Sequence, residues 1–171
     1  MIALWLLGCA PKPAETEPSE KAPIPLTAIP LNGAVDHGVY KDGSLPFSVR
    51  IPDGWTAAPG ATPSPLRVSL TNVDLGLRVE IWSSPRAGAP LRERDGCLWT
   101  FDDVGDYRVF DGSEPVRVAT CTPDEPDDPR VLATVFDRGG ITYQIDASIP
   151  EASFVAGKEA VRGVLDGIEW R

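Results

Sequence analysis

Residues 131–149 read VLATVFDRGGITYQIDASI, and this stretch decides the fold. Two runs, Val131–Phe136 and Ile141–Ile149, flank the sequence Asp137-Arg138-Gly139-Gly140. Apolar and polar residues alternate in the second run, as they do in a half-buried β-strand. The two glycines supply the positive φ angles that a tight turn needs. The stretch therefore predicts an antiparallel β-hairpin. One face of its second strand holds Ile141, Tyr143, Ile145 and Ala147, and the other holds Thr142, Gln144 and Asp146.

The same alternation recurs earlier in the chain and predicts further strands. Trp82 follows the parity of Arg78 and Glu80, which assigns this indole to the polar face of its strand. Together the strands predict one antiparallel sheet of about six to eight strands. The earlier candidate strands are Phe47–Ile51, Leu66–Leu70, Leu75–Ile81, Cys97–Phe101, Tyr107–Phe110 and Val116–Thr120.

A single helix is predicted near the C-terminus. Pro150 stands where a helix can begin, and Asp166-Gly167 ends it. The apolar stripe of this helix has to be buried, and one face of the sheet is the available partner. Ile168–Trp170 then returns as a short edge strand. The predicted fold class is α+β, in a single domain of residues 34–171. The stripe consists of Phe154, Val161, Val164, Leu165 and Ile168.

The first nine residues, MIALWLLGC, resemble the end of a bacterial lipoprotein signal peptide. Leu6-Leu7-Gly8-Cys9 is similar to a lipobox, whose cysteine receives diacylglycerol, so residues 1–8 are expected to be cleaved and Cys9 to anchor the protein in a membrane. The alternative is an apolar segment with a chance cysteine. No Lys or Arg precedes the apolar run, so we expect the true start codon upstream. Ala10 occupies the position after Cys9 at which some bacteria have an aspartate that retains lipoproteins in the inner membrane. Since this chain has alanine there, the outer membrane is favoured.

Residues 9–33 are predicted to form a tether that holds the domain off the membrane. Six of the 18 prolines fall between Ala10 and Gly33. Proline fixes φ and removes a hydrogen-bond donor, so this stretch favours extended polyproline II over a sheet interior. The sequence therefore predicts an extracytoplasmic protein held at a bacterial membrane through lipid.

The chain of 171 residues has a formal net charge of −9. Such acidity argues against nucleic-acid binding, which needs Lys and Arg to displace phosphate counterions. Enzymes are also disfavoured, because the sequence has no P-loop, no G-x-G-x-x-G and no G-x-S-x-G motif. The single histidine, His37, is expected to be a solvated residue at the entry to the domain.

Two cysteines remain after Cys9, and an even pair in an exported protein predicts a disulfide. The Cys97–Cys121 bridge would close a loop of about 25 residues. The alternative is two separate buried thiols. The alternation of the strands raises an objection to the bridge. Cys97 shares its face with Trp99 and Phe101, whereas Cys121 shares its face with Arg117 and Ala119. A bulge or a strand end near Cys121 would remove the objection.

Acidic residues concentrate between Asp95 and Asp128, where ten carboxylates face two arginines, a net charge of −8. Clustered carboxylates are hard oxygen ligands and create a steering field, so this stretch is a candidate surface for Ca²⁺ or for a basic partner. The alternative is a solvated, self-repelling loop, and the spacing of the acids departs from an EF-hand. No other cofactor is expected. The candidate surface consists of Asp124, Glu125, Asp127 and Asp128.

Two motifs resemble PsbP-like domains, which are named after an extrinsic subunit of the photosynthetic oxygen-evolving complex and have bacterial lipoproteins among their relatives. Residues 47–55, FSVRIPDGW, resemble the strand and turn that open these domains. The stretch 56–65 departs from the family, because its Pro and Gly content excludes the helix commonly found between the early strands. The second motif consists of Gly140, Tyr143, Ile145 and Phe154, followed by Val164-Leu165-Asp166-Gly167-Ile168.

The resemblance implies a non-enzymatic binding or assembly role and assigns no catalytic residue. We therefore expect a lipid-anchored domain that binds or scaffolds an envelope protein. One alternative is a lipoprotein that binds Ca²⁺ or a small ligand at the acidic loop. The other alternative is an unrecognised envelope hydrolase, since a pair of catalytic carboxylates leaves no motif in a sequence.

Overall fold

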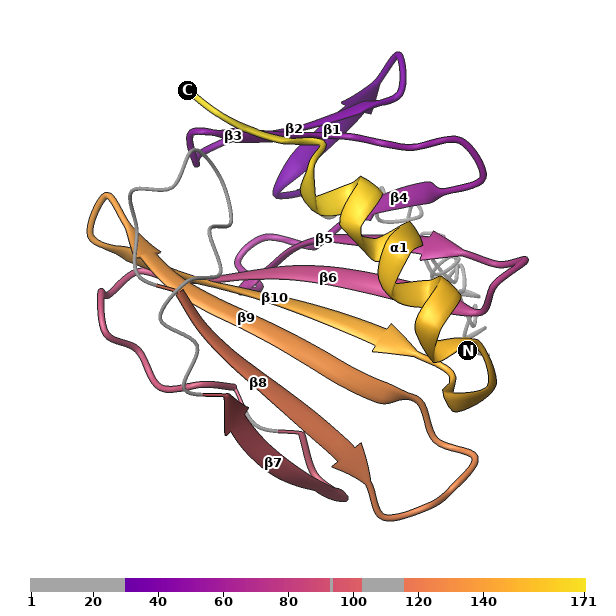
Figure 1. Cartoon of the computed structure of the whole chain (residues 1–171). Coiled ribbons are helices and arrows are strands. Elements are labelled where there is room, and N and C mark those ends of the chain that lie inside the picture. Colours follow the sequence, from indigo (N-terminus) through magenta and orange to yellow (C-terminus); the bar gives the residue numbers. More distant parts are fainter. Residues whose placement is uncertain (1–29, 93, 103–115) are drawn as a thin grey trace, which may run out of the picture.

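The computed structural model describes residues 30–92, 94–102 and 116–171 (Figure 1). Within these residues the chain forms two antiparallel sheets and one C-terminal α-helix. The smaller sheet has the order β1(Gly33–Asp36), β2(Val39–Asp42), β3(Phe47–Arg50), β11(Ile168–Trp170). The larger has the order β4(Thr56–Pro59), β5(Leu66–Asn72), β6(Leu77–Ser84), β10(Ile141–Ile149), β9(Arg130–Arg138), β8(Val116–Pro123), β7(Cys97–Asp102).

The predicted hairpin is present as β9 and β10. Tyr143 lies opposite Phe136 in the register, and Ile145 lies opposite Thr134. Gly139 and Gly140 form the turn between the strands, and both have positive φ. The antiparallel, strand-dominated α+β architecture is therefore confirmed.

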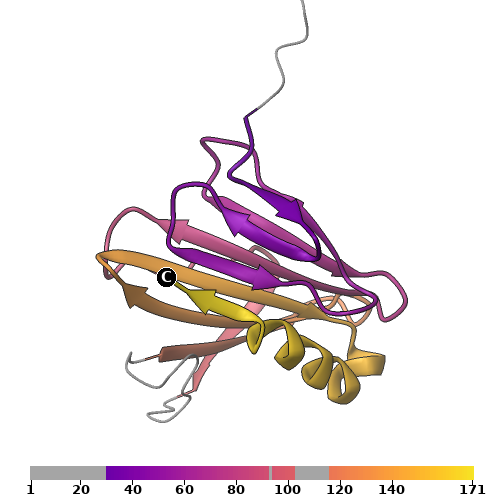
Figure 2. The ribbon, with the colours of Figure 1, turned by 90° about the horizontal axis from the view of Figure 1, so that it is seen from above.

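The prediction of a single sheet is wrong, because four strands separate into a second sheet. The seven-stranded sheet is within the predicted range, but β3 pairs with β2 and β11 instead of joining it. Strands of three or four residues carry too little alternation to reveal a sheet of their own. Figure 2 shows β11 beside β3, so the two ends of the domain meet in this small sheet.

Aromatic side chains fill the core between the sheets. Phe47 of β3 meets the ring of Tyr143 of β10 edge-on, with ring centroids 6.1 Å apart. The ring of Trp170 of β11 lies 4.8 Å from that of Tyr143, and Phe136 stacks on Tyr143 from β9. Tyr143 therefore connects the two sheets at the centre of the core.

The C-terminal helix consists of a short 3-10 turn, η1(Glu151–Ser153), and α1(Phe154–Leu165). Val161 and Val164 of α1 are buried members of the core. Gly157 lies against Ile149 of β10 and Leu77 of β6, and a methyl group at this position would fall 2.5 Å from the Ile149 Cγ2 atom. The helix ends before Gly167, and β11 follows it as predicted.

The packed part of the chain includes residues that the sequence analysis assigned to the tether. Asn32 is buried, and its side-chain amide donates to the carbonyl oxygens of Ser64 and Leu66. Leu31 bridges to Ala61. Residues 1–29, with Cys9 and most of the predicted tether, lie outside the described residues. In the described ranges no helix has the length and apolar character needed to cross a membrane.

A polar pocket on the second face of the large sheet

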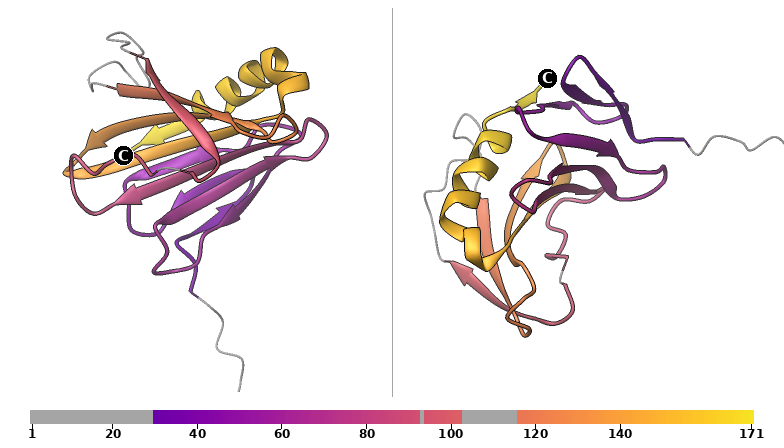
Figure 3. Two further views of the ribbon diagram at one scale, coloured as in Figure 1. Left: turned by 90° about the horizontal axis from the view of Figure 1, so that it is seen from below. Right: turned by 90° about the vertical axis from the view of Figure 1, so that its right-hand side faces the viewer.

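The face of the large sheet that turns away from the aromatic core carries its side chains in rows across the strands. In one row Arg78 of β6 lies opposite Ser148 of β10, and Ser148 lies opposite Val131 of β9. In the next row Glu80 lies opposite Asp146. The face is thus polar where β6 meets β10 and apolar toward β9. Figure 3 shows that the β7–β8 end of this sheet twists away from the β5–β6 end.

A segment after β6 crosses this polar face and buries part of it. We call residues 85–92 the crossing segment. The amide N–H of Ala89 donates to the Thr142 hydroxyl at 3.0 Å. Further along, the amide of Gln144 accepts from the Arg92 N–H at 2.7 Å and donates to the Arg92 carbonyl at 3.1 Å. These bonds leave Thr142 and Gln144 almost fully buried, although both lie on the polar face.

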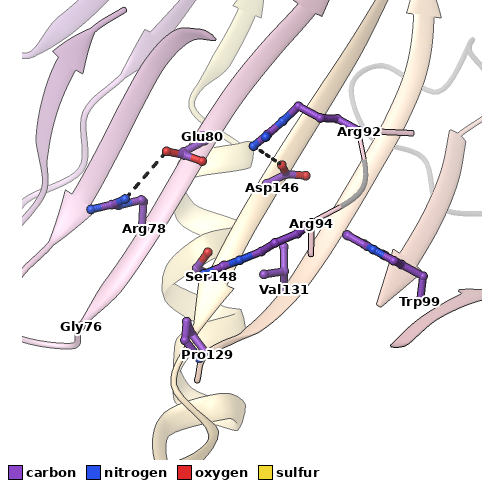
Figure 4. Close-up of a pocket in the computed structure, with 10 residues that line it drawn as sticks. All are labelled: Gly76, Arg78, Glu80, Arg92, Arg94, Trp99, Pro129, Val131, Asp146 and Ser148. Carbon is purple, nitrogen blue, oxygen red and sulfur yellow. Dashed lines mark ion pairs between the residues drawn. The ribbon is translucent and has the colours of Figure 1, made fainter. Parts of the chain in front are cut away.

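Beside the crossing segment lies a pocket of about 440 Å³ (Figure 4). This volume is within the range of small-molecule sites. The floor comes from β6, β9 and β10, and one side comes from β7. Arg92, the last residue of the crossing segment, and Arg94 reach over the floor. The lining residues are Gly76, Arg78, Glu80, Arg92, Arg94, Trp99, Pro129, Val131, Asp146 and Ser148.

Asp146 is the buried carboxylate of the pocket. Its Oδ1 accepts from the amide nitrogen of Gln144 at 2.8 Å, and its Oδ2 lies 3.7 Å from a guanidinium nitrogen of Arg92. Burial raises the pKa of Asp146 to about 6, an increase that the neighbouring charge of Glu80 reinforces. The Gln144 hydrogen bond and the charges of Arg92 and Arg94 oppose it. Asp146 therefore changes charge near pH 6.

Arg92 is fixed in place by three kinds of contact. Its guanidinium lies 3.7 Å above the ring of Trp82, in a cation–π arrangement, and it also faces Asp146. Its backbone pairs with Gln144. The indole that the sequence assigned to the polar face is therefore half-buried under Arg92, and Arg92 itself lines the pocket.

The fold is PsbP-like. The chain is similar to the solution structure of cyanobacterial PsbP (CyanoP) from Synechocystis sp. PCC 6803, with a TM-score of 0.55 and 13% sequence identity. The match covers 78% of this chain and 91% of that chain. No family model matches the chain, and no curated protein does. At this identity the likeness establishes the fold alone, and it confirms that part of the resemblance seen in the sequence. Residues 56–59, where a helix was not expected, form β4.

The predicted disulfide between Cys97 and Cys121 is present, with Cα atoms 5.5 Å apart. The alternative of two separate thiols is wrong. The parity objection disappears because Trp99 lies opposite Cys121, which places Cys97 and Cys121 on the same face. The bridge thus fixes the edge strand that carries Trp99 into the wall of the pocket.

The candidate acidic surface lies on the turn between β8 and β9. Asp124, Glu125, Asp127 and Asp128 are all exposed there. Nowhere in the described ranges do three or more His, Cys, Asp or Glu side chains gather so that they could hold a metal ion. Four other acids of that stretch, from Asp103 to Glu114, lie outside the described residues. The turn leads into Pro129, which borders the pocket.

Sequence reasoning missed the pocket because it identified Thr142, Gln144 and Asp146 only as the second, polar face of a strand. Alternation identifies the two faces of a strand, but it does not reveal what covers the polar one. His37 is exposed as expected, in the two-residue turn between β1 and β2, where it adopts a positive φ.

Proposed function

We propose that this protein is a non-enzymatic binding domain, held through lipid at Cys9 on the extracytoplasmic side of a bacterial membrane, preferably the outer membrane. The single observation that supports a binding role is the pocket, whose walls are fixed before any ligand arrives. The crossing segment is hydrogen-bonded to β10 on one side, and the disulfide secures β7 on the other. Preorganised walls lower the entropic cost of binding.

The occupant is either a small molecule or a segment of an envelope protein, and a photo-crosslinker tests which. A photoreactive residue at Arg94 reports on the pocket, and one at Lys158, an exposed residue of α1, is the matched control. If the domain scaffolds a protein, membranes of the source organism yield a protein adduct from position 94 alone. If it binds a small molecule, position 94 yields no protein adduct and a ligand copurifies with the parent protein, in which Arg94 is intact. If no protein adduct forms at position 94 and no ligand copurifies, the binding role is contradicted.

The anchor is tested by labelling cells with a radioactive fatty acid. A lipidated Cys9 predicts that the label and membrane association are both lost in Cys9→Ala and retained in Cys97→Ala. Label in both variants, or in neither, would contradict lipidation at Cys9.

A hydrolase is the second candidate, and the carboxylates of the pocket give it a specific basis. Glu80 and Asp146 lie opposite each other on neighbouring strands, and Asp146 has a pKa of about 6. A pair of facing carboxyl groups is the arrangement that glycoside hydrolysis uses. Turnover of an aryl glycoside that disappears in Asp146→Asn and in Glu80→Gln would establish it, and absence of turnover favours binding.

The alternative of a Ca²⁺-binding lipoprotein rests on the exposed acids of the β8–β9 turn. Calorimetric titration with Ca²⁺ is its test. Heat that is lost in an Asp124→Asn/Asp128→Asn variant would support it, and no heat at millimolar Ca²⁺ would remove it.

A further inference from the structure

Two guanidinium groups at the β6–β10 end of the pocket form no hydrogen bond with a described carboxylate. The nearest carboxylate oxygen to Arg78 is that of Glu80, at 3.9 Å, well beyond the roughly 2.8 Å of a charge-assisted hydrogen bond. Arg94 forms no ion pair with any carboxylate in the described part of the chain. Figure 4 shows Arg94 reaching across the floor toward Ser148. Since Ser148 lies opposite Arg78 in the register, the three side chains border one end of the pocket.

We propose that the pocket binds a small organic anion, a phosphate, sulfonate or carboxylate attached to an apolar body. The acidic group is held by Arg94 and Arg78 beside the Ser148 hydroxyl. Guanidinium groups present paired donors that match the oxygens of such groups. The inference rests on the proposed binding function and names its ligand class.

The apolar body has its own place in the pocket. Val131 follows Ser148 in the same row of the floor, and Trp99 and Pro129 line the neighbouring side. Val131 is buried and Trp99 is half-buried in the wall secured by the disulfide. An aromatic or aliphatic group that extends from the anion over Val131 toward Trp99 would gain apolar contacts that inorganic phosphate lacks.

The charges that line the pocket favour an anionic ligand over a cationic one. Asp146 already accepts from Gln144 and faces Arg92, and the closest described cation to Glu80 is Arg78. Three arginines and two carboxylates line the pocket, and Arg94 forms no ion pair with a described carboxylate. The surplus charge is positive, although the chain as a whole is acidic.

The test measures the binding of three probes to the full chain carrying Cys9→Ala, by calorimetry or NMR shifts at pH 7.5. Phenylphosphate combines the anion with a ring, inorganic phosphate has no ring, and benzamidinium has a ring and a positive charge. We expect phenylphosphate to bind at least tenfold more tightly than either of the others. Equal binding of the two phosphates, or tighter binding of benzamidinium, would overturn the proposal.

Matched variants locate the site. Arg94→Gln is expected to weaken phenylphosphate at least tenfold, and Arg162→Gln, on an exposed position of α1, to leave it unchanged. Both side chains are exposed, so both variants are expected to fold, which the thermal midpoint checks. A variant pair with equal affinities would overturn the assignment of Arg94. Binding of none of the probes, together with an adduct from position 94 in membranes, would refute the ligand class and leave the binding function standing.

The acidic group can belong to a soluble compound or to the head of a lipid, and vesicles separate these sources. Sedimentation with phosphatidylglycerol vesicles, absent with phosphatidylcholine and lost in Arg94→Gln, identifies an anionic lipid. Binding of phenylphosphate without such sedimentation identifies a soluble anion. Sedimentation that Arg94→Gln leaves unchanged would show that lipid does not enter the pocket.

Discussion

The carboxylate of Asp42 and the guanidinium of Arg67 join the two sheets through a paired contact. Asp42 ends β2 of the small sheet and Arg67 belongs to β5 of the large one. The Nε and Nη2 atoms of Arg67 donate to the two carboxylate oxygens at 2.8 and 2.7 Å. The Asp42 side chain is fully buried and that of Arg67 is 11% exposed.

The Asp42 carboxylate is kept ionised by several donors. Burial alone raises its pKa, but the hydrogen bonds from Arg67, the backbone of Ser44 and Leu45, and the Tyr40 hydroxyl together hold the pKa below its usual value. The same burial and the nearby Asp42 raise the pKa of Tyr40. Every strong acceptor position of Asp42 is therefore occupied, which indicates a structural role.

Removing one partner of this pair is expected to destabilise the protein strongly. Arg67→Met leaves a buried carboxylate without its counter-charge, at a cost of about 3–5 kcal/mol in the free energy of unfolding, measured with urea. Because the folded pKa of Asp42 is lowered, its contribution is present above the unfolded pKa, near 4, and is lost as the pH falls through the folded value.

The exposed pair Arg50–Glu169 is the matched control, since it also joins distant parts of the chain, across β3 and β11. Its side chains are 72% and 64% exposed, so Glu169→Gln is expected to cost at most about 1 kcal/mol. Equal losses from Arg67→Met and Glu169→Gln would contradict the structural role given to Asp42.

Loss of the disulfide is expected to destabilise the domain by a smaller but measurable amount. In the chain-entropy model, a bridge across about 25 residues contributes roughly 3–4 kcal/mol. The Cys97→Ser/Cys121→Ser variant should therefore unfold at lower urea than the parent in an oxidising buffer. In a reducing buffer the two should coincide. A difference that persists after reduction would mean that the serines, and not the missing bridge, cause the loss.

A methyl group at Gly157 is expected to disturb the packing of α1. Alanine usually stabilises a helix by about 1 kcal/mol relative to glycine. Here its Cβ would meet Ile149 Cγ2 at 2.5 Å and Leu77 Cδ2 at 3.0 Å, and overpacking costs about 1–3 kcal/mol. Gly157→Ala should thus lower the thermal midpoint.

Gly163, in the same helix, has nothing within 4 Å of the place where a Cβ would stand. Gly163→Ala is therefore expected to raise the thermal midpoint through helix propensity alone. Opposite shifts from the two substitutions would verify the position of Gly157, and a rise for both would show that the contact with Ile149 and Leu77 yields easily.

The hairpin of β9 and β10 could be predicted because each strand has nine residues and a Gly-Gly turn joins them. The small sheet could not, since β11 pairs with β3 across more than a hundred residues and neither strand exceeds four. Local alternation carries no information about such long-range pairing. The disulfide was predictable from cysteine count, independently of the strand pairing.

The pocket could not be predicted for a different reason. Its floor was visible as polar positions of predicted strands, but residues 85–92, which cover the neighbouring floor, have no strand or helix period. Their backbone N–H groups donate to the side chains of Thr142 and Gln144, and these contacts bury part of the polar face. Burial in the folded protein raises the pKa of Asp146, and its neighbours in the sequence do not.

Asp146 is expected to make the protein less stable as the pH rises. Its folded pKa of about 6 lies above the unfolded value near 4, so the folded state binds the proton more tightly. Stability from this group is fully present below pH 4 and is lost as the pH rises through 6, by roughly 2–3 kcal/mol. The charges that face the carboxyl are those of Glu80 in β6, Arg92 at the end of the crossing segment, and Arg94 two residues later.

Asp146→Asn removes this titration and keeps an oxygen that can accept from Gln144. Arg92 stays in place through its backbone bonds to Gln144 and its contact with Trp82. The variant should therefore equal the parent near pH 4.5 and exceed it in stability at pH 7.5, measured by urea unfolding. Asp124→Asn, on the exposed β8–β9 turn, is the control and should follow the parent throughout.

The same proton should govern the pocket. Protonation of Asp146 removes a negative charge beside Arg92 and Arg94, so an anion should bind more tightly as the pH falls from 7.5 to 5.5. Benzenesulfonate is the suitable probe, because its own charge stays constant over this range. In Asp146→Asn its affinity should be high and independent of pH. An affinity that rises equally in the parent and in the variant would show that another group titrates, and would separate Asp146 from the binding site.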